Sequence, residues 1–104
     1  MARQRVTRDE AVSMIRLRLD FTASAMTGYT NYEGDFVIKS YSTEIARATK
    51  AGIVWVTTLR YTATTDRHLS FVRRGFAKDD VVYAETLEQA KTTTKWRDLE
   101  AVRA

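Results

Sequence analysis

The sequence predicts a single α+β domain, in which a small antiparallel sheet of about four strands is combined with an N-terminal helix, a helix from about residue 65 and a C-terminal helix. Apolar residues alternate with period two in residues 36–41, and residues 53–61 are rich in β-branched and aromatic side chains, which predicts strands. Apolar residues recur at helical spacing near the N-terminus and again after residue 65. Short connections between the extended segments predict an antiparallel meander, because parallel strands need long crossovers.

The composition is that of an ordinary globular protein. The chain has 104 residues, of which 44% are apolar and 29% are charged, so we expect one domain over residues 1–104 with its own core. It has no cysteine, which excludes disulfides, cysteine-based zinc sites and a cysteine nucleophile. No apolar run approaches the roughly 20 residues that span a bilayer, so we expect a soluble, non-exported protein without a membrane partner.

The N-terminal helix is predicted from a capping signal and a wide apolar face. Thr7 and Glu10 have the spacing of a capping box, and a helical pattern follows to about Asp20. Residues 15–21 also alternate with period two, so a strand is the alternative there. The apolar positions are Ala11, Val12, Met14, Ile15, Leu17, Leu19 and Phe21.

The predicted meander spans about residues 21–61. Its extended segments are residues 21–32, 36–41, 42–49 and 53–61, with turn signals at residues 33–35 and 50–52. Residues 21–32 fit a first strand and the start of a hairpin. In the last segment, Ile53, Trp55, Thr57 and Leu59 share one face.

A second helix is predicted from about residue 65, where Thr64 or Thr65 can serve as its N-cap and Asp66 lies in its first turn. Its buried stripe consists of Leu69, Val72 and Phe76. A short strand at residues 81–84 and a C-terminal helix with Leu87, Ala90, Trp96, Leu99 and Val102 follow. We treat residues 80–104 as a variable extension of a core formed by residues 21–74. The predicted buried residues are Ile15, Leu19, Phe36, Ile38, Ile45, Val54, Val56, Leu69 and Val72.

Enzymatic chemistry has little support in the sequence. His68 is the only histidine, and Asp66 is two positions away, which on a helix points the two side chains apart. The chain has no glycine-rich loop and too few ligands for zinc, so we expect no catalytic, metal or cofactor site. Asp79 and Asp80 with Glu85 or Glu88 fit a solvated acidic cluster. We interpret Thr65 and His68 as structural, with His68 fixing the strand-to-helix junction through a hydrogen bond.

Two motifs resemble a family of small uncharacterised proteins encoded by bacteriophages and related mobile elements. Residues 36–46 read FVIKSYSTEIA and residues 54–68 read VWVTTLRYTATTDRH. They are similar to the family pattern of an SYxTxIA strand, a VWV-type strand and then Y-[ST]-x-T-T-x-x-H entering a helix. The resemblance covers about residues 21–74. Because that family has no established activity, the resemblance implies a phage-like origin and the host cytoplasm as location, without a mechanism.

Protein interaction is the function that we expect first, with a host protein as partner. Met14, Leu17 and Phe21 extend the apolar face of the first helix beyond what one packing partner needs, which is typical of an interface. The same face is also explained by a helix buried between the sheet and the C-terminal helix, or by the seam of a homodimer.

Sequence-nonspecific nucleic-acid binding is the alternative function. The net charge is +4, and residues 47–78 contain seven cations against the single acid Asp66. A basic segment combined with exposed aromatic residues of a sheet would supply phosphate contacts and stacking platforms. The expected contact residues are Arg60, Arg67, Arg73, Arg74 and Lys78. Many cytosolic domains carry the same net charge without binding nucleic acid.

Overall fold

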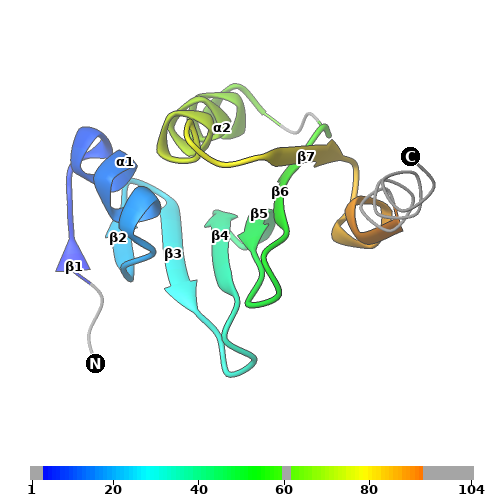
Figure 1. Cartoon of the computed structure of the whole chain (residues 1–104). Helices are drawn as coiled ribbons and strands as arrows, with labels where there is room; N and C mark the ends of the chain where they lie inside the picture. The colour runs from blue at the N-terminus through cyan, green and yellow to red at the C-terminus, as the bar shows by residue number, and fades with distance from the viewer. Residues whose placement is uncertain (1–3, 60–61, 93–104) are drawn as a thin grey trace.

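In the part of the chain that the structure describes, seven strands form one mixed sheet whose spatial order follows the sequence, and two helices pack on one of its faces (Figure 1). The structure is a computed structural model that describes residues 4–59 and 62–92. Its strands are β1 (Gln4–Arg5), β2 (Phe21–Ala23), β3 (Met26–Thr30), β4 (Phe36–Ser40), β5 (Thr43–Ala48), β6 (Val54–Thr57) and β7 (Val81–Ala84). Its helices are α1 (Arg8–Leu17) and α2 (Ala63–Gly75), and a further helical segment begins at Leu87.

The two ends of the sheet are parallel pairs, which the sequence did not predict. β1 pairs with β2 and β6 pairs with β7 in parallel, whereas β2 to β6 form an antiparallel meander. The α+β class and the antiparallel meander over about residues 21–61 are therefore confirmed in outline. The meander has five strands where about four were expected, and a parallel strand extends the sheet at each end. Each parallel pair is connected through a helix. Both pairs run in the same direction, so right-handed crossovers place α1 and α2 on the same face of the sheet.

The segment predicted as a first strand, residues 21–32, contains two strands. β2 and β3 are joined by a two-residue turn at Ser24 and Ala25, so the chain reverses earlier than the glycine signal at residues 33–35 suggests. β5 also departs from simple alternation, because Ile38 pairs with Ala46 while the next residue pairs with Glu44. This bulge explains why Ile45 and Ala46 are both buried.

The predicted cap of α1 is confirmed, but the helix ends earlier than expected. Thr7 N–H donates to Glu10 Oε1 at 3.1 Å, and Glu10 N–H donates to Thr7 Oγ1 at 3.2 Å. The helix stops at Leu17 because Arg18 adopts a left-handed conformation with φ 57°. Both interpretations of residues 15–21 are therefore right for part of the segment, which begins as helix and ends as strand. Leu19 lies between the two elements and is 47% exposed, so its predicted burial is wrong.

The cap of α2 is Thr62, not Thr64 or Thr65. Thr62 has extended backbone angles, and its Oγ1 accepts the N–H of Thr65 at 3.2 Å. The helix therefore starts at Ala63, and Thr65 is an internal, buried residue. Asp66 lies in the first turn as expected, where its negative charge interacts favourably with the helix dipole and stabilises the helix.

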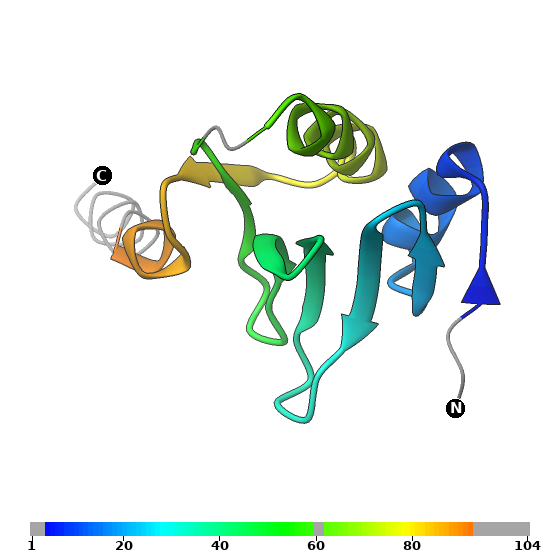
Figure 2. The same cartoon turned by 180° about the vertical axis from the view of Figure 1, so that it is seen from behind.

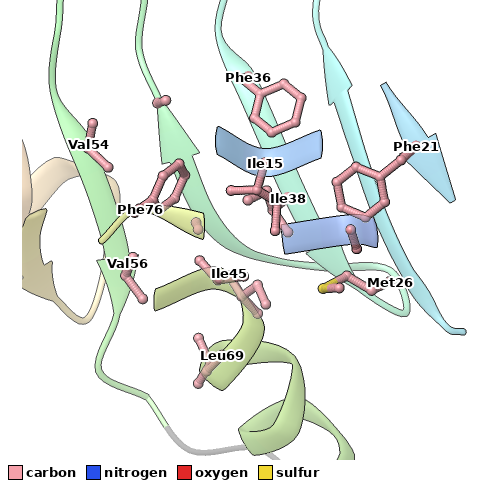
Figure 3. Close-up of a cluster of buried hydrophobic side chains, with 14 of the residues drawn as sticks. Ile15, Phe21, Met26, Phe36, Ile38, Ile45, Val54, Val56, Leu69 and Phe76 are labelled. Carbon is pink, nitrogen blue, oxygen red and sulfur yellow. The ribbon is translucent and has the colours of Figure 1, made fainter. Parts of the chain in front are cut away.

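The main core lies between the sheet and the two helices (Figure 3). Apart from Leu19, all of the predicted core residues are buried there; these are Ile15, Phe36, Ile38, Ile45, Val54, Val56, Leu69 and Val72. Phe21, Met26 and Phe76 are the other large side chains of this core, and four alanines fill the remaining positions. The predicted stripe of α2, with Leu69, Val72 and Phe76, is thus confirmed.

A smaller apolar cluster lies on the opposite face of the sheet. Trp55 and Val82 pack there against Ala90. Ala90 belongs to the helical segment that follows β7, which lies on the far side of β6 and β7 from α2 (Figure 2). Trp55 also donates its Nε1–H to the carbonyl oxygen of Ala84 at 2.9 Å. These contacts explain why a tryptophan on the last strand of the predicted meander is 3% exposed and is not a stacking platform. The expected positions Trp96, Leu99 and Val102 lie outside the described residues.

Candidate functional site

His68 is the centre of a buried polar network that links α2 to two turns of the sheet. The side chain is 1% exposed. Its Nδ1 lies 2.6 Å from Ser40 Oγ, and its Nε2 lies 3.0 Å from the carbonyl oxygen of Ser24. A carbonyl oxygen only accepts, so Nε2 carries the hydrogen in the neutral ring and Nδ1 accepts from the hydroxyl of Ser40. The expected hydrogen bond of His68 is present, but it anchors these turns and not the junction between β6 and α2.

The network continues from Ser40 to the N-cap of α2. Ser40 Oγ lies 3.0 Å from Thr65 Oγ1, and Thr62 Oγ1 donates to Thr65 Oγ1 at 3.2 Å. Because the hydrogen of Ser40 is used on His68, Thr65 must donate to Ser40. When His68 is neutral, all hydrogen bonds of the network therefore point in the same direction, from Thr62 towards Ser24. Hydrogen bonds connected in such a chain polarise and strengthen one another.

The two turns that His68 holds both contain strained residues. Ala25 has φ 55° and Tyr41 has φ 57°, a left-handed conformation that costs a non-glycine residue about 1–2 kcal/mol. The turns are also joined directly, because Tyr41 N–H donates to the carbonyl oxygen of Ala25 at 2.7 Å. The hydrogen bonds of His68 thus fix two neighbouring hairpin turns that are both strained.

The contact between Ser40 and His68 has the length of a nucleophile–base pair but not its accessibility. Ser40 is 1% exposed, so a substrate cannot reach its hydroxyl in this conformation. Burial lowers the pKa of His68, with a further contribution from the charge of Arg8, against the raising effect of the hydrogen bond to Ser24. The imidazole is therefore neutral at neutral pH. The arrangement favours a structural role for His68 and Thr65.

The basic segment at residues 47–78 is divided between opposite faces of the molecule. Arg47 lies on the face of the sheet away from the helices, where it pairs with Asp35 at 3.1 Å and Glu44 at 2.6 Å. The hydrogen bond to Glu44 is the main reason that the pKa of Arg47 is raised. Arg47 was not among the expected nucleic-acid contact residues. Those that the structure describes are exposed on α2 or just after it, namely Arg67, Arg73, Arg74 and Lys78. The fifth, Arg60, lies outside the described residues.

The exposed side chains of α1 and α2 include more basic than acidic residues. We define the helix face by its exposed arginines, which are Arg8, Arg16, Arg67, Arg73 and Arg74. The acids of the same two helices are Asp9, Glu10 and Asp66. The ion pair between Arg74 and Asp9 is long, at 3.9 Å, and solvent-exposed, so it holds the two side chains together only weakly.

The predicted apolar interface is not a continuous surface. Phe21 is fully buried, because it belongs to β2 and faces the core, so its prediction as an interface residue is wrong. Met14 is partly buried against the same core, and Leu17 is 63% exposed at the end of α1. Of the three residues, only Leu17 presents most of its side chain to a partner.

The outer edge of β7 has backbone groups that no described strand pairs. Thr58 N–H donates to the carbonyl oxygen of Ala84 at 3.0 Å, so the backbone groups of Ala84 face β6. Backbone direction alternates along a strand, and the N–H and C=O groups of Val81 and Tyr83 therefore point outward. Tyr83 is 54% exposed on this edge.

Two hollows lie beside the end of β7 and share Thr58 and Tyr83. One of about 380 Å³ lies against α2 and includes Leu69 and Arg73. The other, of about 610 Å³, lies against the helical segment after β7 and includes Glu85 and Glu88. We call the edge and its two hollows the β7 groove. The sequence predicted the strand at residues 81–84, but not that it would be an edge.

The acidic residues near β7 are dispersed. Asp79 pairs with Arg18 at 3.0 Å, and Glu88 pairs with Lys91 at 3.8 Å. Within residues 4–59 and 62–92, no group of three or more His, Asp or Glu side chains is placed to hold a metal ion. In the same part of the chain, no helix has the length and apolar character needed to cross a membrane.

Comparison with known proteins gives one match. A family model described as "Family of unknown function (DUF8033)" matches residues 10–89. No curated protein and no solved structure matches the chain. The matched residues run from the first turn of α1 to the helical segment after β7, and therefore include both the His68 network and the β7 groove.

Proposed function

Because the chain belongs to this family of unknown function, we propose its function from its own surface: it is a non-enzymatic interaction module that binds an extended segment of a partner protein along β7. The observation that carries the proposal is the unprotected edge of this strand. Natural edge strands are usually blunted by charged residues, proline or bulges. Residues 81–84, Val-Val-Tyr-Ala, have none of these, whereas the opposite edge is the two-residue β1 with Arg5.

An added strand would satisfy the outward backbone groups of Val81 and Tyr83 and place its side chains in the two hollows. Strand addition draws affinity from main-chain hydrogen bonds and specificity from pockets for alternate side chains. The hollow against α2 offers the half-exposed ring of Tyr83 to an apolar side chain, beside the polar residues Asp66 and Arg73. The hollow against the helical segment after β7 offers Glu85 and Glu88 to a lysine or arginine of the bound segment. The segment that fits best alternates apolar and basic residues.

The partner that we propose is a host protein, met in the host cytoplasm. This setting rests on the resemblance of residues 36–46 and 54–68 to proteins encoded by phages and mobile elements. A second copy of the chain is the competing occupant, because two β7 strands could pair with one another. The experiment below separates the two.

Tyr83→Pro is expected to weaken binding of a peptide of alternating valine and lysine by at least about tenfold. The substitution removes one outward N–H and the exposed ring, and one or two hydrogen bonds correspond to about that factor. Proline is tolerated on an edge whose N–H groups face solvent, so the variant should still fold. The measurement is peptide titration followed by NMR, with shifts expected at Val81, Tyr83 and Glu85.

The matched control for the peptide titration is Tyr32→Ala, which removes a 97% exposed tyrosine at the distant β3–β4 turn and should leave binding unchanged. Peptide shifts elsewhere on the protein, or equal affinity of wild type and Tyr83→Pro, would reject strand addition at β7. A dimer in light scattering that Tyr83→Pro dissociates would assign the edge to a second copy and overturn the host-protein proposal.

Nucleic-acid binding through the helix face is a second candidate, favoured by the five exposed arginines on two neighbouring helices. Arg67 and Arg74 are seven residues apart on α2, and thus about 10 Å apart along its axis. If they contact phosphates, Arg67→Glu with Arg74→Glu should reduce the slope of log affinity against log salt for duplex DNA by about 2. Fluorescence anisotropy across a salt series measures this slope.

Lys50→Glu with Lys91→Glu is the control for the helix face, because it changes the net charge by the same amount away from α1 and α2. An equal loss of affinity in both double variants would show that only net charge matters. It would remove the helix face as a specific surface. Wild-type protein that does not bind DNA even at low salt would remove the second candidate altogether.

A further inference from the structure

The hydrogen-bond chain through His68 has a defined direction in its neutral state. Thr62 donates to Thr65, Thr65 donates to Ser40, Ser40 donates to His68, and His68 donates to the carbonyl oxygen of Ser24. Among the described residues, no buried side-chain nitrogen or oxygen lacks a hydrogen-bond partner. When His68 is neutral, the hydroxyl groups of Thr62, Thr65 and Ser40 therefore each donate to the next member of the chain towards the ring.

A proton added to His68 is incompatible with this direction. Nδ1 becomes a donor, and the Ser40 oxygen at 2.6 Å is its partner. Ser40 must then turn its hydrogen towards Thr65, and Thr65 must turn its own towards Thr62. The same three distances serve both states, so the change needs rotation of hydroxyl groups and no movement of the backbone.

We propose that this chain is a proton switch: uptake of a proton by His68 reverses the donors at Ser40 and Thr65 and turns the hydroxyl of Thr62 outward at the N-terminus of α2. Thr62 is exposed, so its hydroxyl can donate to water or to a bound group. In the neutral state the same hydroxyl donates inward to Thr65. A buried ring 28 residues from Ser40 in the sequence thereby controls the hydrogen-bonding character of a surface residue.

The surroundings of His68 determine that it takes up its proton below neutral pH. From α1, the charge of Arg8 acts on the ring, and from the sheet the uncharged Ser24 and Ser40 bond to it. The Tyr41 ring lies 6.3 Å from the imidazole, centroid to centroid. In the described part of the chain, no carboxylate hydrogen-bonds to the ring. Burial and Arg8 therefore oppose the proton, and the pKa of His68 in the folded state lies below its ordinary value of 6.5.

The lowered pKa also fixes the sign of the pH dependence of stability. As pH falls through 6.5, the unfolded chain takes up a proton at His68 before the folded chain does. The folding equilibrium constant therefore falls with decreasing pH by up to about tenfold per unit, until the folded state is protonated as well. The contribution of the neutral ring is fully present above pH 6.5.

The test is an NMR pH titration of the ring nitrogens of His68 and the methyl group of Thr62. In wild type, the Thr62 methyl shift should move with the same midpoint as the ring, and the neutral ring should carry its hydrogen on Nε2. Thr65→Val keeps the shape of the side chain but breaks the chain. In this variant His68 should still titrate while Thr62 no longer responds. Ser70→Ala, an exposed polar change on the same helix, should leave the coupling intact.

A purely structural histidine would not couple to Thr62, so a Thr62 methyl that stays fixed while His68 titrates would overturn the switch. A ring that remains neutral until acid unfolds the protein would overturn it too. The wild-type titration decides both points, even where Thr65→Val does not fold.

Discussion

Replacing Phe21 by alanine is expected to lower the free energy of unfolding by about 3–5 kcal/mol, the usual loss for a large aromatic side chain in a packed core. Phe21 is fully buried in the core (Figure 3). Its ring lies over Gly28 of the neighbouring strand. The substitution leaves a cavity that the surrounding β strands can close only in part. Urea denaturation followed by circular dichroism measures the loss.

Leu17→Ala is the matched control for Phe21→Ala, because Leu17 belongs to the same predicted apolar face but is 63% exposed. Its loss of stability should stay within about 0.5 kcal/mol. Comparing the two variants therefore shows which residue of the predicted apolar face belongs to the core and which is free for an interface. Unchanged stability of Phe21→Ala together with lost partner binding would contradict its burial and restore the interface.

Features whose signals lie close together in the sequence were predictable. Two helical features were predicted correctly, because neighbours on a helix are three or four residues apart. They are the capping box of Thr7 and Glu10 and the buried stripe of Leu69, Val72 and Phe76. The strands at residues 36–41 and 81–84 were visible from alternation and β-branched residues. The end of α1 was not, since a left-handed arginine at residue 18 has no sequence signal of its own.

The topology was not predictable, because it depends on pairs of distant segments. β1 has two residues and joins the sheet only through its parallel pair with β2. The strand at residues 81–84 was expected, but nothing in its sequence says that α2 brings it back beside β6. The predicted helix between the strands at residues 53–61 and 81–84 permits a parallel crossover, but it does not say which strand residues 81–84 pair with.

The candidate sites could be predicted only in part, because they also combine residues that are distant in the sequence. His68 and Thr65 were singled out, but Ser24 and Ser40 are 44 and 28 residues from the histidine and are ordinary serines in the sequence. The basic segment looked like one surface because charge was counted along the chain. In the folded protein, Arg47 and the arginines of α2 belong to opposite faces.

Gly28→Ala is expected to lower the free energy of unfolding by about 1–3 kcal/mol, as overpacking of a filled core does. Gly28 pairs directly with Phe21 across β2 and β3. A Cβ atom at residue 28 would overlap Cε1 of the Phe21 ring and lie 2.8 Å from its Cδ1. An aromatic ring lying over a cross-strand glycine is a known way to protect such a position, and it requires the glycine. Thermal and urea unfolding measure the loss.

The contact between Phe21 and Gly28 is tested most directly by the double variant Phe21→Ala with Gly28→Ala. Once the ring is gone, the added methyl group no longer clashes and partly fills the cavity, so the combined loss should be smaller than the sum of the single losses by about 1 kcal/mol or more. Phe21→Ala with Gly52→Ala should instead be additive, because a Cβ at Gly52 meets nothing within 4 Å and costs only the strain of φ +103°. Additive losses at Phe21 and Gly28 would mean that the ring does not lie over the glycine. The burial of Phe21 would then need another explanation.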